Sequence, residues 1–232
     1  KEGIKVVEIH RVPENVKYED IISINGNFEY SMHASVEGLR IKFFPKLGYP
    51  RDIVKKIEDE IYLAHLLNVK ELVVHGGSFF KGYIRLSKFI KRTIGLKYFL
   101  EVFARTFGPI FKKANDYGIK VLIENCYPCF LLGRPHDIVY LKQKLPFLGF
   151  CFDLAHAEIY KQTEDLMKLD IDHVHITDNN KKVDQHLKIG EGSIDFKDFF
   201  KKLRAKNYNK KVIVECSKID DSLYSIRRLK IF

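Results

Sequence analysis

The segment from Asp172 to Asp195, DHVHITDNNKKVDQHLKIGEGSID, contains the pattern that decides the fold. It opens with a short β-branched run, Val174-His175-Ile176, which is typical of a buried strand. A polar stretch follows, and Gly190 and Gly192 allow it to turn sharply. Asp195 then stands where an N-cap would precede a helix. The segment therefore predicts a buried strand, a loop and a helix, in that order.

The same strand-then-helix pattern recurs along the chain. Helices are predicted over 50–67, 96–117 and 196–203, and the second of these has a phenylalanine at every fourth position from Phe99 to Phe111. Alternating strands and helices predict a parallel sheet with right-handed crossovers. The predicted strands are Val6–Ile9, Tyr30–His33, Leu72–His75, Val121–Glu124, Phe150–Asp153, Val174–Ile176 and Val212–Glu215.

Seven such strands predict an α/β fold, a single (β/α)₈ TIM barrel over residues 1–232 that lacks its first strand. Lys1–Lys5 reads as the tail of the helix after that strand, so most of the first helix is expected to be missing too. An open doubly wound sheet is the alternative, but no glycine-rich phosphate loop follows Val6–Ile9. The open edge of an incomplete barrel is expected to be exposed or covered by a neighbouring chain, so an oligomer is one expectation.

The composition excludes several classes of protein. The chain is 46% hydrophobic and 30% charged, which excludes long disorder, collagen and a disulfide scaffold. No apolar run approaches the ~18 residues of a membrane span, so no membrane partner is expected. Four cysteines without a secretory segment suggest a reducing, cytoplasmic compartment. The net charge of +10 would suit a nucleic acid, although a lysine-rich solvated surface is the commoner explanation, and the Lys, Ile and Glu content is compatible with a thermophile.

Metal-binding side chains recur at the strand ends. In a parallel barrel these ends meet at one face, where the active site lies. Any one such residue is commonly structural, but the repetition over six strands predicts a metal site. Imidazole and carboxylate donors favour Zn²⁺, Mn²⁺ or Fe²⁺ over Ca²⁺. The six side chains are His33, His75, Glu124, Asp153, His175 and Glu215.

The loop after the sixth of these strands adds two further candidates. Asp184 and His186 are separated by one residue, so in an extended loop both side chains point the same way and can reach one ion. His173 and His175 share a face of their strand for the same reason. His175 is the favoured ligand because it lies nearer the carboxyl end of the strand.

Five segments together resemble the xylose isomerase-like barrel superfamily. This superfamily includes sugar isomerases and epimerases as well as the endonuclease IV group of abasic-site nucleases. The resemblance spans His33 to Glu215, most of the chain. The segments are ELVVHGG at 71–77, VLIEN at 121–125, GFCFDLAHAEIY at 149–160, HVHITDN at 173–179 and VDQHLKIGEGSIDF at 183–196.

The resemblance implies two different metal sites. In the isomerases and epimerases one divalent ion (Zn, Mn, Mg or Fe) would be held by Glu124, Asp153, His175 and Glu215. The two glutamates would then exchange a proton with a small sugar or sugar phosphate, and His156 would bind a substrate oxygen. In the nuclease, Glu124 would bridge two of three zinc ions, and the substrate would be DNA. The remaining five nuclease ligands would be His33, His75, His156, Asp184 and His186.

The isomerase-like function is favoured over the nuclease. The stretch between Val6–Ile9 and Tyr30 is only about twenty residues and leaves no room for the long DNA-inserting loop of the nuclease. The nuclease run Asp-Thr-Cys-His is replaced by Asp-Leu-Ala-His at 153–156. A non-enzymatic barrel is disfavoured, because an unfilled carboxylate cluster would be destabilising. Asp178, Arg134 and His10, all near the rim, are the predicted substrate contacts.

Overall fold

A computed structural model describes residues 3–10, 28–34, 48–76, 96–126 and 133–230. The chain divides into two compact units, which are described separately. The first unit comprises residues 5–150, and the second comprises residues 1–4 and 151–232. The described residues include all seven predicted strands, and the strand pairs within each unit are parallel.

The described part of the first unit contains four strands that pair in chain order. The pairing places His10 beside His33 and His75 beside Glu124. Because paired residues of parallel strands lie at the same height, the ligand-type side chains gather at the carboxyl ends of these strands. The strands are β1 (Val6–His10), β2 (Glu29–His33), β3 (Glu71–His75) and β4 (Lys120–Glu124).

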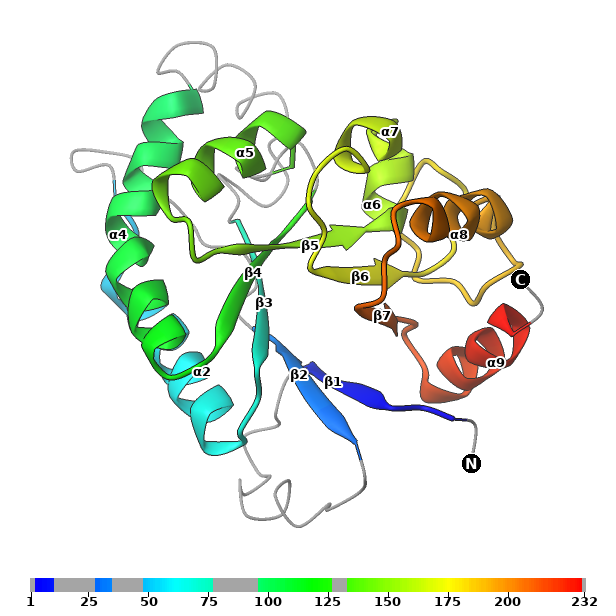
Figure 1. Ribbon diagram of the computed structural model, residues 1–232, viewed down its shortest axis with the longest axis horizontal. Coiled ribbons are helices and arrows are strands. Elements are labelled where there is room, and N and C mark those ends of the chain that lie inside the picture. Colours follow the sequence, from blue (N-terminus) through cyan, green and yellow to red (C-terminus); the bar gives the residue numbers. More distant parts are fainter. Residues whose placement is uncertain (1–2, 11–27, 35–47, 77–95, 127–132, 231–232) are drawn as a thin grey trace. The chain divides into compact units, whose positions relative to one another are not determined.

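Three helices lie among the described residues of the first unit: α2 (Arg51–Leu66), α4 (Leu96–Asp116) and α5 (Pro135–Lys144). Figure 1 shows α2 and α4 side by side along β3 and β4. The predicted phenylalanine stripe from Phe99 to Phe111 is fully buried and forms the centre of the hydrophobic core. After α4, Gly118 adopts a φ of +75°, a conformation that suits glycine and ends the helix.

The second unit contains β5 (Gly149–Asp153, whose first two residues belong to the first unit), β6 (His173–Ile176) and β7 (Lys211–Val214). The register places Asp153 beside His175. The helices are α6 (Leu154–Ile159), α7 (Thr163–Leu166), α8 (Phe196–Ala205) and α9 (Ile219–Leu229).

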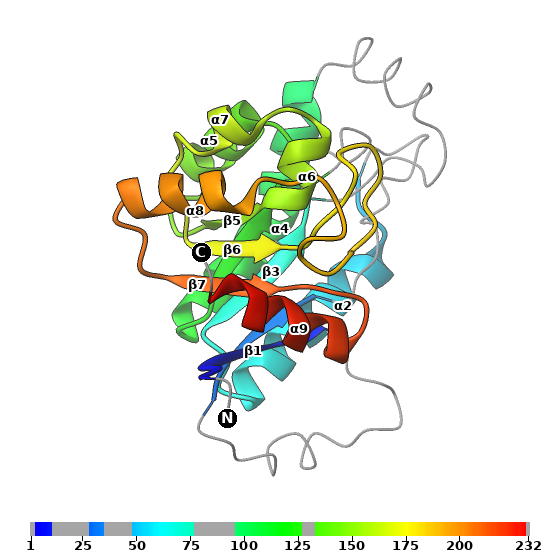
Figure 2. The ribbon, with the colours of Figure 1, turned by 90° about the vertical axis from the view of Figure 1, so that its right-hand side faces the viewer.

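Local contacts explain how the helices of the second unit are placed. Asp195 caps α8, as predicted, because its Oδ1 accepts a hydrogen bond from the backbone N–H of Asp198 at 3.0 Å. The Phe199 ring stacks on Phe152 of β5 at 5.6 Å, which fixes α8 on this side of the strands. Figure 2 shows α9 beside β7.

The predicted helical tail at Lys1–Lys5 is wrong for the described residues 3–5, which are not helical. Gly3 has a φ of +75°, which a right-handed helix does not allow. The Lys5 carbonyl accepts a hydrogen bond from the Glu29 N–H at 2.8 Å, so the chain there already extends the pairing of β1 with β2.

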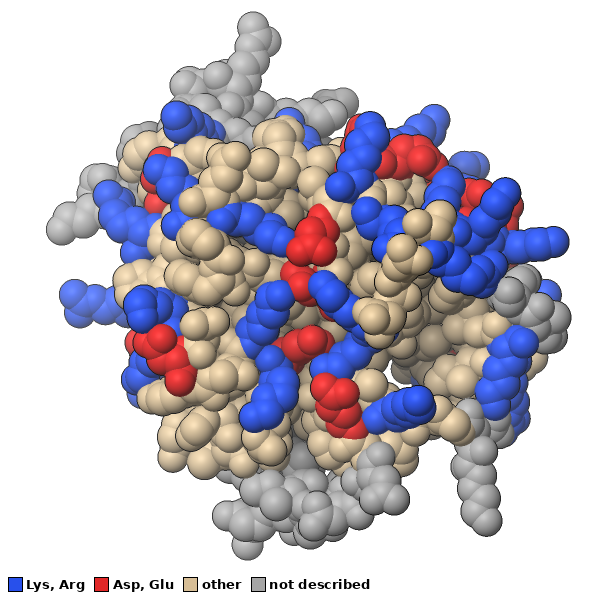
Figure 3. Space-filling model, in the orientation of Figure 1, with Lys and Arg blue, Asp and Glu red and all other residues tan. Residues whose placement is uncertain are grey.

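On the face shown in Figure 3, the described basic residues are distributed rather than gathered. In Figure 3, lysines and arginines are interspersed with carboxylates over the described residues of the visible face. Several form ion pairs, including Lys112 with Asp116, Lys188 with Glu191 and Lys202 with Asp198. The positive charge on this face is therefore typical of a solvated surface. Among the helices that the structure describes, none is both long and apolar enough to cross a membrane.

Candidate metal centre

The first unit contains a buried carboxylate flanked by two histidines, which we call the Glu124 cluster: Glu124, His33 and His75. The Nε2 atoms of His33 and His75 lie 3.0 and 2.9 Å from the same oxygen, Oε2 of Glu124. Glu124 is 1% exposed and His33 is 3% exposed. One desolvated carboxylate oxygen therefore faces two imidazole nitrogens.

Strand ends hold the Glu124 cluster in place. Its three residues are the last residues of β2, β3 and β4, so backbone pairing sets their spacing. The Nδ1 of His33 lies 3.2 Å from the Ala34 carbonyl, to which it can only donate. That contact turns Nε2 toward Glu124, as the outer contact of a metal-binding histidine does. The His10 ring lies 4.6 Å from the His33 ring, at the edge of this cluster.

The second unit contains a similar group, which we call the Asp184 cluster: Asp184, His156 and His186. The Nε2 atoms of His156 and His186 lie 3.3 and 3.0 Å from Oδ2 of Asp184. Oδ1 of Asp184 is buried and has no hydrogen-bond partner among the described residues. The hydrogen bond to Asp184 raises the pKa of His186 to about 10, so this imidazole is a cation at neutral pH in the metal-free protein.

The Asp184 cluster is tied to the end of β7. The Nδ1 of His186 donates to the Glu215 carbonyl at 2.8 Å, which leaves Nε2 directed toward Asp184. His186 holds a left-handed φ of +48°, which is uncommon for a residue with a side chain. A locally strained residue with both ring nitrogens engaged is typical of a functional position.

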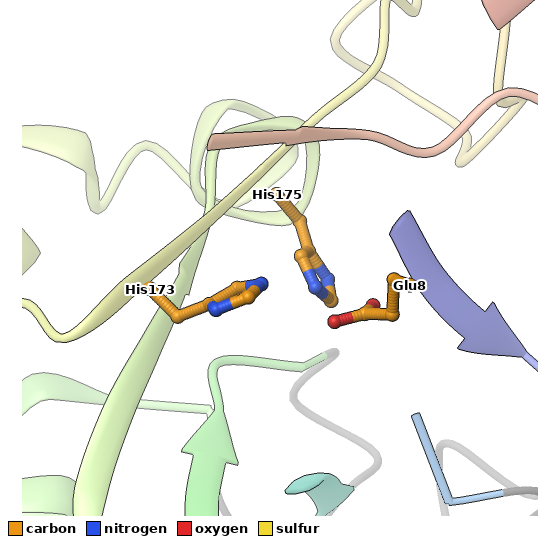
Figure 4. Close-up of side chains that lie close together, drawn as sticks. All are labelled: Glu8, His173 and His175. Atoms are coloured by element: carbon orange, nitrogen blue, oxygen red, sulfur yellow. The ribbon is translucent and has the colours of Figure 1, made fainter. Parts of the chain in front are cut away.

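Three further predicted metal ligands of the second unit lie at or next to strand ends: Asp153, His175 and Glu215. Oδ1 of Asp153 lies 3.5 Å from Nδ1 of His156. The same oxygen accepts a hydrogen bond from the backbone N–H of His156. The Nδ1 of His175 lies 3.4 Å from Oε2 of Glu215. His173 and His175 are both buried and lie close together on β6, as strand alternation predicts (Figure 4).

These residues fit a divalent metal ion. In each cluster two imidazole nitrogens converge on one carboxylate oxygen, and the buried Oδ1 of Asp184 accepts no hydrogen bond from the part of the chain that the structure describes. In the metal-free protein the protonated His186 compensates the Asp184 carboxylate, and a bound metal ion would take that role. Mixed nitrogen and oxygen donors suit Zn²⁺, Mn²⁺ or Fe²⁺. Glu124 belongs to the first unit, and Asp153, His175 and Glu215 belong to the second, so their convergence on one ion stays a prediction.

The three predicted substrate contacts have different surroundings. His10 lies beside the Glu124 cluster. Arg134 precedes α5, with its Nε 3.8 Å from Oδ2 of Asp137. Asp178 is 1% exposed, and both of its oxygens accept backbone N–H groups. Residues 11–27, where the absence of a DNA-inserting loop was predicted, lie outside the described residues.

Cys126 is a potential metal ligand that is not among those predicted from the sequence. A ligand atom of Cys126 lies within 4.8 Å of those of His75 and Glu124, so the thiol is a further potential donor to the Glu124 cluster. The signal was present in the sequence, because Cys126 follows Glu124 by two residues and so points to the same side of an extended chain.

The fold and the Glu124 cluster define a class of protein: a parallel β/α fold with carboxylate and histidine side chains at the strand ends. The chain belongs to the xylose isomerase-like TIM barrel family, whose model matches residues 20–230. Its seven strands correspond to such a barrel lacking one strand.

Individual relatives include enzymes of two kinds. The uncharacterized protein MJ1311 of Methanocaldococcus jannaschii is 29% identical, over 94% of this chain and 74% of that protein. A D-tagatose 3-epimerase-like protein of known structure is 26% identical, with a TM-score of 0.75, over 98% of this chain and 87% of that one. An AP endonuclease, family 2, from Brucella melitensis is 18% identical, with a TM-score of 0.71, over 100% of this chain and 89% of that one. The neighbours are thus sugar epimerases and an AP endonuclease relative.

Proposed function

We propose that this protein is a divalent-metal-dependent isomerase or epimerase acting on a small sugar or sugar phosphate. The observation that carries the proposal is the set of imidazole and carboxylate groups at the strand ends, above all the buried Asp153 and His175 and the half-buried Glu215 of the second unit. Glu124 would supply the fourth ligand. The 26% identity with a D-tagatose 3-epimerase-like protein supports the same substrate class.

The proposed chemistry divides between the ion and the protein. When bound, the ion would polarise a substrate carbonyl and so acidify the neighbouring C–H. Glu124 and Glu215 would remove that proton and return one, because a carboxylate can serve as both general base and acid. His33 and His75 would hold the Glu124 side chain in place through the contacts of their Nε2 atoms with its Oε2.

Outer residues would bind the substrate. His156 would contact a substrate oxygen, with its ring oriented by Asp153. Arg134 would contact the phosphate of a phosphorylated sugar, and His10 would lie at the rim of the site. These roles would affect substrate affinity more than the proton transfer itself.

A second function, zinc-dependent cleavage of DNA at abasic sites, is favoured by one specific observation. The Glu124 cluster and the Asp184 cluster are each a three-residue donor set, which is more than a one-metal enzyme requires. Up to three zinc ions and a DNA substrate would follow from that function. The net charge of +10 would then assist binding to phosphates.

Metal counting and two activity assays separate these functions. Elemental analysis gives the metal content per chain after loading with Zn²⁺ or Mn²⁺. Incubation with ketohexoses and their phosphates in D₂O, followed by NMR, detects proton exchange at carbon even when the product is unknown. A duplex with one abasic site tests the nuclease.

The expected result is one ion per chain and deuterium incorporation that is lost in Glu215→Gln. Three ions with cleavage of the duplex would replace the first proposal by the second. Absence of bound metal in the parent protein would overturn both.

A further inference from the structure

Asp178 lies two residues after the end of β6. Its Oδ1 accepts the backbone N–H groups of Asn179 at 2.9 Å and Ile194 at 3.2 Å. Its Oδ2 accepts those of Gly190 and Gly192, both at 2.9 Å. A buried carboxylate that accepts four backbone N–H groups has little capacity left for a ligand.

These hydrogen bonds close the loop that carries Asp184 and His186. The backbones of Asp178 and Leu187 exchange two further hydrogen bonds, at 2.9 and 3.0 Å. The loop therefore begins at Asp178 and comes back to its backbone at Leu187, one residue after His186. Residues 190–194 then hydrogen-bond to the Asp178 side chain.

The neighbouring residue links the same loop to α6. The Asn179 side-chain amide donates to the Ala155 carbonyl at 3.1 Å, and the backbone carbonyl of Asn179 accepts the Ser193 N–H at 2.9 Å. Ala155 directly precedes His156, the third member of the Asp184 cluster. The loop that carries Asp184 and His186 and the helix that carries His156 are thus both held through Asn179, the residue next to Asp178.

Gly192 shows how tightly the loop is drawn onto Asp178. A Cβ at this position would lie 2.3 Å from Oδ1 of Asp178 and 2.4 Å from the Asn179 carbonyl oxygen. Such contacts are far shorter than van der Waals separation, so only glycine permits this approach.

We propose that Asp178 is a positioning residue: it fixes the loop that presents Asp184 and His186 to the metal centre and does not itself contact substrate. The hydrogen bonds of Asp178 support its role in holding the loop. The effect of that role on metal and substrate binding rests on the proposed metal-dependent function. In Asp178→Asn the amide NH₂ cannot accept a hydrogen bond, so two of the four N–H groups lose their acceptor.

A double-mutant cycle tests this role. The proteins are the parent, Asp178→Asn, His186→Ala and the double variant, and the measurements are the zinc dissociation constant by chelator competition and KM for the ketose turned over. Loss of an outer contact that orients a ligand typically weakens metal binding 10–100-fold. If Asp178 acts through the loop, Asp178→Asn should weaken whichever constant His186→Ala weakens. In the double variant the two effects should then be less than additive, because both changes disturb the same loop.

Hydrogen exchange of the metal-free proteins supplies a readout independent of activity. The amides of Gly190, Gly192 and Ile194 should be protected in the parent and exchange faster in Asp178→Asn. The matched control is Asp195→Asn, another carboxylate that accepts a backbone N–H in the same segment, but one that is exposed and caps α8. It should leave zinc affinity and KM unchanged.

The outcomes distinguish the two proposals. A parent that binds no metal and turns over no sugar overturns the proposed function and, with it, the consequence assigned to Asp178. If the parent is active, additive effects in the cycle, or an Asp178→Asn variant with the parent's zinc affinity and KM, overturn the positioning role alone.

Discussion

The Glu124 cluster and the Asp184 cluster have the same local chemistry but are built differently. In each, one carboxylate oxygen faces the Nε2 atoms of two histidines at 2.9–3.3 Å. All residues of the Glu124 cluster are the last residues of strands, so the backbone ladder fixes them. The Asp184 cluster takes two residues from a loop and one from α6. Side-chain anchors such as Asp178 must supply there the rigidity that strand pairing supplies in the first cluster.

The largest effect is expected from Glu124→Gln. The amide keeps the shape of the side chain but loses the charge and one acceptor, leaving His33 and His75 without a carboxylate. We expect metal affinity to fall by at least ~100-fold, beyond the range typical of outer contacts, and turnover to be lost. Isothermal titration with Zn²⁺ and the deuterium-exchange assay measure both. Glu58→Gln, on the exposed face of α2, is the control and should behave as the parent.

A smaller and more selective effect is expected from His186→Ala. If one ion is held by Glu124, Asp153, His175 and Glu215, the variant should retain one ion per chain and change substrate binding instead. If the Asp184 cluster holds its own zinc, the count should fall from three to two, because a site with two protein ligands binds far more weakly. Elemental analysis of the parent and the variant decides between them, and a fall from three to two would contradict the isomerase proposal.

The pH dependence of zinc affinity should show whether His186 of the Asp184 cluster is a metal ligand. The pKa of His186 is raised to about 10 by Asp184, against ~6.5 for an unperturbed histidine. The hydrogen-bonded cation therefore stabilises the metal-free protein fully below about pH 6.5, and that contribution is lost as pH rises through about 10. If His186 ligates zinc it must first lose this proton, so zinc affinity should rise up to ~10-fold per pH unit between pH 7 and 9. His186→Ala should reduce that slope by about one; an unchanged slope would show that His186 remains protonated when metal binds.

The smallest effects are expected from alanine substitutions at two glycines in turns, Gly192 and Gly118, and concern stability. Gly192→Ala should cost roughly 1–3 kcal/mol of stability, because its Cβ meets Asp178 and Asn179 at 2.3–2.4 Å and the loop must move. Gly118→Ala has open space around its Cβ and should cost only about 1 kcal/mol, for its φ of +75°. Chemical denaturation measures both. Only Gly192→Ala should also change zinc affinity or KM, and an equal effect of Gly118→Ala would contradict the role of the loop.

The sequence by itself determined the elements and the donor chemistry. Short β-branched runs gave all seven strands, and the four-residue spacing of Phe99, Phe103, Phe107 and Phe111 gave the buried face of α4. These features are local, because periodicity reports directly which side of a strand or helix is buried. The same applies to the Asp184-x-His186 pair, whose two side chains meet as their spacing predicts.

Tertiary structure alone decided the role of residues whose partners are distant in the chain. Asp178 follows a strand as Glu124 ends one, and the sequence suggested a substrate contact for it. The structure shows that its oxygens accept N–H groups up to sixteen residues away, which is the basis of the positioning role that we propose. In the same way, Lys1–Lys5 has a helix-compatible composition, yet Lys5 pairs with Glu29. A local pattern records burial and period, but which backbone N–H groups reach a given carboxylate depends on how the loop closes, and only the folded chain fixes that closure.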